Sequence, residues 1–74
     1  MDKEVETIVE RTIRHTRAIL TISPDRWDHA RRGMLTIRDS LAARAPGHPA
    51  LERLTAFVRA EDRWRAGWRD ARRP

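Results

Sequence analysis

The stretch Thr21-Ile22-Ser23-Pro24-Asp25-Arg26-Trp27 decides how this chain folds, because one helical pattern ends there and another begins. Ser23 is a residue type that caps the first amides of a helix, and Pro24 suits the first helical position, where its missing N–H is not needed. Ile22 and Trp27 flank this start at the spacing of a hydrophobic staple. The stretch therefore predicts a helix boundary at residues 22–24.

The segment before this boundary carries apolar side chains at intervals of three and four, which places them on one helix face. The stripe consists of Val5, Ile8, Val9, Thr12, Ile13, Thr16, Ile19 and Leu20. Acidic residues lie toward its start and arginines toward its end, in the order that a helix dipole favours. We predict a helix over about 3–21, in which Thr12 and Thr16 bond a carbonyl one turn earlier.

Two further helices are predicted after the boundary. The second covers about 24–44 and carries an apolar stripe of Trp27, Ala30, Met34, Ile37, Leu41 and Ala45. The stretch Ala45-Pro46-Gly47-His48-Pro49 ends it, and His48 reads as a loop residue. Pro49 suits the first position of a third helix over about 49–72.

These elements predict an all-α fold, a small antiparallel three-helix bundle with up-down-up topology, in one domain of 74 residues. That topology brings Trp64 and Trp68 toward Ile19, Leu20, Ile22 and Trp27. A chain this short has a thin margin of stability, and it contains no cysteine for a disulfide or a thiolate zinc site. Self-association as a homodimer, or a partner, would add stability.

The end of the chain is its most chemically specific part. Residues 63–74 hold two of the three tryptophans and five arginines. Two aromatic side chains four residues apart share a helix face, and arginines beside them can stack on the rings or meet an anionic partner. The candidate partner-binding residues are Arg63, Trp64, Arg65, Trp68, Arg69, Arg72 and Arg73.

The apolar face of the third helix rotates along its length, and this leaves two interpretations open. One stripe consists of Leu51, Leu54 and Val58, and a displaced stripe of Phe57, Trp64, Trp68 and Ala71. A helix that crosses the bundle diagonally would bury both stripes. Alternatively, the second stripe is a surface for a partner. Glu61 lies between the stripes, and we expect Arg31 or Arg38 to neutralise it.

No motif indicates catalysis, a phosphate loop or a cofactor, so we do not expect an enzyme. Asp25, Asp28 and His29 fall within one helical turn and could join His15 at a metal, but acids in a first turn are ordinary, and we expect no metal. No apolar run reaches the ~18–20 residues of a membrane span, and the start Met1-Asp2-Lys3-Glu4 is unlike a signal peptide. We expect a cytoplasmic protein without membrane contact.

These observations favour a protein–protein interaction module, such as an adaptor, an inhibitor or a small subunit, whose partner presents an acidic or amphipathic helical surface. The alternative is a nucleic-acid-binding protein that uses the Arg/Trp-rich third helix, consistent with the net charge of +5. Against that alternative, Glu61, Asp62 and Asp70 interrupt the basic stretch.

Overall fold

The computed structural model describes the backbone of residues 2–72 and the side chains of residues 2–67. It contains three α-helices, α1 (Lys3–Ile22), α2 (Trp27–Arg44) and α3 (Pro49–Arg72), with a short 3₁₀ helix η1 (Pro24–Arg26) between the first two. Residues 2–72 contain no strand, so the all-α prediction is confirmed. The second α-helix begins at Trp27 because residues 24–26 form the tighter turn of η1.

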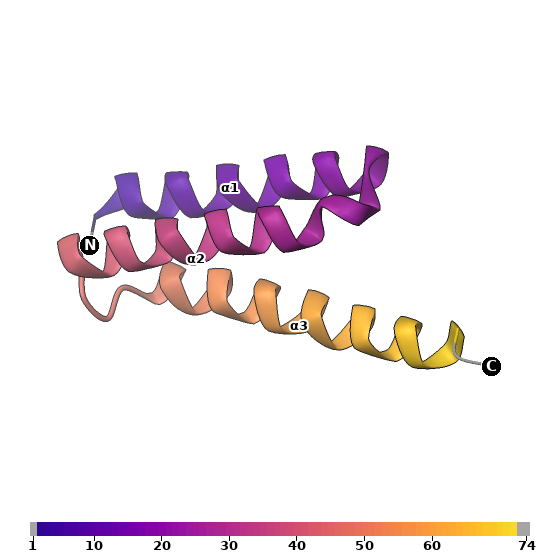
Figure 1. Cartoon of the computed structure of the whole chain (residues 1–74). Helices are drawn as coiled ribbons and strands as arrows, with labels where there is room; N and C mark the ends of the chain where they lie inside the picture. The colour runs from indigo at the N-terminus through magenta and orange to yellow at the C-terminus, as the bar shows by residue number, and fades with distance from the viewer. Residues whose placement is uncertain (1, 73–74) are drawn as a thin grey trace.

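The helices lie side by side and share one core. In Figure 1 the chain reverses direction around η1 and again after α2, and the last turns of α3 extend past the end of α1. Each α-helix contacts the other two. The buried core residues are Val5, Val9, Leu20, Trp27, Met34, Leu41, Ala50, Leu54, Phe57 and Val58. The predicted stripes of all three helices therefore supply the interior.

The start of η1 differs from the sequence-based expectation. Pro24 does occupy its first turn, but the Ser23 side chain makes no capping hydrogen bond, and its backbone N–H instead closes α1 by donating to the Ile19 carbonyl at 2.7 Å. The predicted staple between Ile22 and Trp27 is also wrong, since Ile22 is 83% exposed and Trp27 is buried. At 100° per residue Ile22 lies about 200° from the buried Leu20, on the opposite side of α1.

His48 has a structural role that the sequence did not reveal. Its ring is buried, and its Nδ1 accepts a hydrogen bond from the Ala50 N–H at 3.0 Å, which caps the first turn of α3. Since Nδ1 is an acceptor there, the ring proton lies on Nε2, which donates to the Asp2 carbonyl at 3.0 Å. One side chain thus joins the start of α3 to the start of α1, and Gly47, with φ 75°, makes the turn before it.

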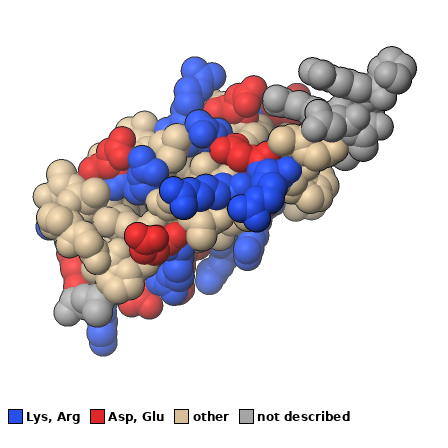
Figure 2. All heavy atoms as spheres, turned by 90° about the horizontal axis from the view of Figure 1, so that it is seen from below, with Lys and Arg blue, Asp and Glu red and all other residues tan. Residues whose placement is uncertain are grey.

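Ion pairs connect the acidic start of α1 to the other two helices. Arg44 of α2 contacts Asp2 at 3.3 Å and Glu4 at 2.9 Å. The hydrogen bond from Arg44 holds the pKa of the Glu4 carboxyl below its ordinary value, and the positive charge of Arg44 adds to this effect. Arg53 of α3 contacts Glu6 and Glu10 in the same way. On the face seen in Figure 2, acidic and basic side chains are interspersed.

Candidate protein-binding surface at the Trp64 end

The end of the molecule where α1 meets η1 and α3 passes both is called here the Trp64 end, and Trp27 is its buried centre. The Trp27 ring is 4% exposed and packs edge-on against Phe57, with ring centroids 6.4 Å apart and an interplanar angle of 69°. Trp27 is the first residue of α2, and its ring lies against Phe57 of α3. Trp27 and Phe57 therefore form the aromatic interface between these two helices.

Asp62 satisfies the polar edge of that ring. Its Oδ1 accepts the Trp27 Nε1–H at 2.9 Å, and both of its carboxylate oxygens accept from Arg31 Nε at 3.1 and 2.9 Å. Arg31 thus pairs with Asp62 and not with Glu61. The expectation that Arg31 neutralises Glu61 is therefore wrong, because Arg31 pairs with the next residue. Successive side chains of a helix differ in direction by 100°, so Glu61 and Asp62 face different neighbours.

Glu61 and Arg38 instead find other partners. The Glu61 carboxylate lies 3.7 Å from Nη2 of Arg65, one turn later on the same helix. Arg38 lies 3.1 Å from its neighbour Asp39. Glu61 also lines a hollow of about 410 Å³ together with Arg17, Leu20, Thr21, Trp64 and Arg65.

Arg65 holds the Trp64 end together. Its guanidinium carbon lies 5.3 Å from the Trp27 ring centroid and 5.5 Å from that of Trp64, and its Nη1 donates to the Pro24 carbonyl at 3.1 Å. The side chain is 12% exposed, and its Nε is buried without a hydrogen-bond partner among the described atoms. Arg65 was predicted to meet a partner; in this structure its guanidinium is engaged within the chain.

Trp64 occupies a different environment from Trp27. Its side chain is 62% exposed, although it shares Arg65 with the buried ring and lines the same hollow as Leu20. The predicted approach of Trp64 to Leu20 and Trp27 is therefore found at this end of the molecule. Arg63 is exposed and forms no ion pair within residues 2–67. The side chains predicted at Trp68, Arg69, Arg72 and Arg73 lie outside the described residues.

The displaced apolar stripe of α3 is buried at Phe57 and exposed at Trp64. Phe57 from the displaced stripe is buried beside Leu54 and Val58, as expected for a helix that crosses the core diagonally. One and a half to two turns later Trp64, from the same stripe, lies largely in solvent. The core stripe therefore ends before the second tryptophan of the sequence.

No group of three or more His, Asp or Glu side chains within residues 2–67 is arranged to hold a metal ion. Asp25, Asp28 and His29 are all exposed. Over the same described residues, no helix combines the length and the apolar character needed to cross a bilayer. Comparison of the chain with protein-family models, with curated proteins and with solved structures finds no match.

Proposed function

We propose that this chain is a small protein–protein interaction module, an adaptor, an inhibitor or a small subunit of a larger assembly, folded as an up-down-up three-helix bundle. It acts by binding and not by turnover. The observation that carries the proposal is the contrast between the two tryptophans at one end: Trp27 is 4% exposed and fixed in the core, whereas Trp64 is 62% exposed. Exposed tryptophans flanked by arginines are typical of binding hot spots.

The surroundings of Trp64 support a binding role for its ring. Arg65 is fixed by Glu61 and by the Pro24 carbonyl, and it holds one face of the indole at 5.5 Å. A side chain that is already oriented loses less rotamer entropy when a partner covers it. Arg63 beside it is exposed and supplies a positive charge for an acidic or amphipathic helical partner. The sequence-based candidates Trp68, Arg69, Arg72 and Arg73 stay part of the proposal.

A homodimer is part of the proposal. Small domains gain stability by association. Two large apolar side chains are exposed near the end of α1: Ile22 is its last residue, and Trp64 of α3 lines a hollow with Leu20 and Thr21. Sedimentation equilibrium at several protein concentrations measures this directly. A single species at the mass of one chain over the whole range would remove the homodimer from the proposal.

Two alanine substitutions test the main proposal. Trp64→Ala should leave the thermal midpoint and the helical circular dichroism close to those of the natural chain, because the ring is mostly in solvent. Affinity purification from the native host with the natural chain should recover a protein that the Trp64→Ala chain does not recover. The same measurements are made on Trp68→Ala. If Trp64→Ala unfolds the chain, the ring is part of the core and the proposal fails.

Nucleic-acid binding is the second candidate, and one observation favours it. Glu61 and Asp62 interrupt the basic stretch in the sequence, but Arg65 and Arg31 neutralise them within the fold. This leaves Arg63 and the exposed Trp64 ring for phosphate contact and base stacking. A titration with a single-stranded oligonucleotide at two salt concentrations separates the candidates, because phosphate contacts lose affinity steeply as salt rises. Absence of any binding at low salt would exclude this candidate.

A further inference from the structure

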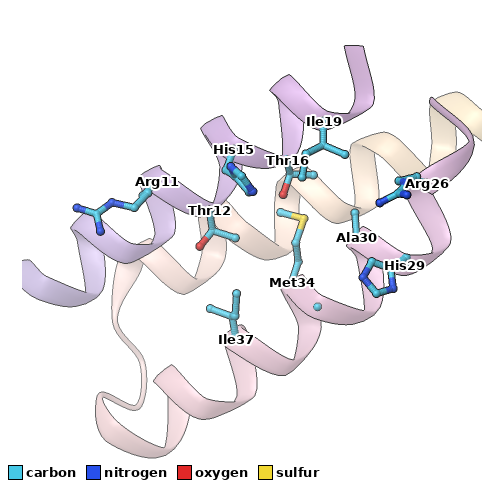
Figure 3. Close-up of a pocket in the computed structure, with 11 residues that line it drawn as sticks. Arg11, Thr12, His15, Thr16, Ile19, Arg26, His29, Ala30, Met34 and Ile37 are labelled. Carbon is cyan, nitrogen blue, oxygen red and sulfur yellow. The ribbon is translucent and has the colours of Figure 1, made fainter. Parts of the chain in front are cut away.

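A second surface lies between α1 and α2, where a groove of about 550 Å³ has no lining residue from α3. Its apolar floor is formed by Ile19, Ala30, Met34 and Ile37. Met34 is 2% exposed, and Figure 3 shows Met34 and Ile37 pointing from α2 toward α1. The Thr12 hydroxyl in the groove already donates to the Ile8 carbonyl at 2.7 Å, so it needs no further partner. The floor is therefore a surface for apolar side chains.

The rim of the groove is positively charged. Arg11 lies toward one end, and Arg26 lies with His29 toward the other (Figure 3). Both arginines are exposed, and neither forms an ion pair within residues 2–67. No carboxylate is among the described residues that line the groove. An apolar floor with this rim fits an occupant that carries apolar side chains along its centre and acidic side chains beside them.

The shape of the groove favours a helix as the occupant. The lining residues of α1 run from Arg11 to Ile19, which at 1.5 Å per residue is about 12 Å, or about two helical turns. A helix laid along this length presents four anchors, at positions i, i+3, i+4 and i+7. Because α3 already packs on the same two helices from another side, a further helix here would extend the same kind of packing.

We propose that this groove binds an amphipathic helix of another protein, with about two turns of apolar anchors and with Asp or Glu beside them that pair with Arg11 and Arg26. A second copy of this chain is a poorer occupant. Its own groove carries the same positive rim, and the acids of its α1 that face α2 and α3 are already paired within the fold. The groove shares no lining residue with the hollow beside Trp64, and the proposal does not depend on that surface.

Two glycines provide a matched pair of variants for the test. Gly33 lines the groove, Gly67 lies on α3 outside it, and a Cβ at either position meets no atom within 4 Å. Leucine at either site removes a helical glycine, and its Cβ meets no atom of the fold within 4 Å. Only Gly33→Leu fills the groove, so only this variant should lose binding. Circular dichroism of both variants checks that the fold is intact.

The probe is a displayed library of 18-residue helices in which the apolar anchors are fixed and the flanking positions vary among Asp, Glu, Lys, Arg and Gln. Selection on the natural chain should enrich helices with acidic flanks. The enriched peptides should bind Gly67→Leu within about twofold of the natural chain and Gly33→Leu at least about tenfold more weakly, since filling a packed site costs a large part of the contact energy.

A charge test accompanies the steric one. Arg11→Gln with Arg26→Gln should weaken the enriched peptides and flatten their salt dependence, whereas Arg59→Gln, an exposed residue of α3 outside the groove, should not. The proposal is overturned if no helix is enriched, if basic flanks are enriched, or if Gly33→Leu binds as well as Gly67→Leu. A concentration-dependent dimer that Gly33→Leu abolishes would assign the groove to a second copy and would equally overturn it. If Trp64→Ala abolishes binding of the enriched peptides and Gly33→Leu does not, the peptides occupy the other surface and the proposal is likewise overturned.

Discussion

The indole Nε1 of Trp27 donates a hydrogen bond of 2.9 Å to Oδ1 of Asp62, and this bond joins the first residue of α2 to the middle of α3. The same carboxylate accepts two contacts from Arg31. A buried indole N–H needs an acceptor, and a carboxylate near the core needs a cation, so the three side chains satisfy one another. Trp27 is therefore the tryptophan that maintains the fold, whereas Trp64 is exposed.

Asp62→Ala should lower the free energy of unfolding by about 2 kcal/mol, because it leaves the buried Trp27 N–H without its acceptor. Chemical denaturation of the two chains measures the difference. The matched control is Asp39→Ala, which removes the more exposed ion pair with Arg38 and should cost less than about 0.5 kcal/mol. Equal effects of the two substitutions would show that the indole bond adds nothing to stability.

His48→Ala should lower the unfolding free energy by about 2 kcal/mol, because it removes the acceptor for the Ala50 N–H and the donor to the Asp2 carbonyl. His48→Asn should recover part of this loss, since an Asn side chain can cap Ala50 without reaching Asp2. Thermal unfolding of the three chains checks the order. If His48→Ala is as stable as the natural chain, His48 is an ordinary loop residue.

The three glycines should respond differently to alanine. Gly33→Ala and Gly67→Ala should each raise stability by about 0.5–1 kcal/mol, since both glycines lie inside helices and a Cβ meets no neighbour. Gly47→Ala should lower stability by roughly 1 kcal/mol, because its φ of 75° lies in the left-handed region. Urea denaturation of the three variants tests the sign of each change. A stabilising Gly47→Ala would contradict the turn described here.

Glu4→Gln should destabilise the chain at neutral pH and have less effect in acid. Arg44 lowers the pKa of Glu4 in the fold below the ordinary 4.5, so the interaction stabilises the fold above that value and is lost as the pH falls through the folded-state pKa. The thermal midpoints of the natural chain and of Glu4→Gln should therefore converge as the pH falls below 4.5 and through the lowered folded-state pKa of Glu4. The control is Glu52→Gln, an exposed acid in the first turn of α3 that forms no ion pair within residues 2–67. A difference in thermal midpoint between Glu4→Gln and the natural chain that does not narrow in acid would contradict the pairing of Glu4 with Arg44.

Much of the fold was predictable from the sequence because it depends on helical periodicity. The recurrence of apolar residues in α1, the start signal at Pro24 and the stop at Pro46 and Gly47 are local features, and the structure places all of them as helix or turn. The incorrect predictions, the Ser23 side-chain cap and the packing of Ile22 on Trp27, concern residues at or next to a helix end. A 3₁₀ turn replaced the expected start of α2, and Ile22 lies in solvent because it is on the opposite side of α1 from the buried Leu20.

The candidate site was predictable in position but not in detail. The approach of Trp64 to Trp27 followed from the helix lengths, whereas the contact of Arg65 with both rings did not. Their division into core and surface did not, because a shift of one residue along α3 turns a side chain by 100°. The same shift explains why Arg31 meets Asp62 and not Glu61. His48 gave no signal at all, since its burial depends on Asp2, which is 46 residues away.

We propose that the exposed Trp64 ring contacts a protein partner, while Trp27 and Arg65 hold the fold. The most direct measurement replaces Trp64 with a photoreactive phenylalanine derivative and identifies what becomes cross-linked in the native host. We expect a protein adduct that excess natural chain suppresses and that excess Trp64→Ala chain does not suppress. The adduct should be absent when the same group replaces the exposed Arg14 of α1. A nucleic-acid adduct, the same adduct from position 14, or suppression by Trp64→Ala would contradict it.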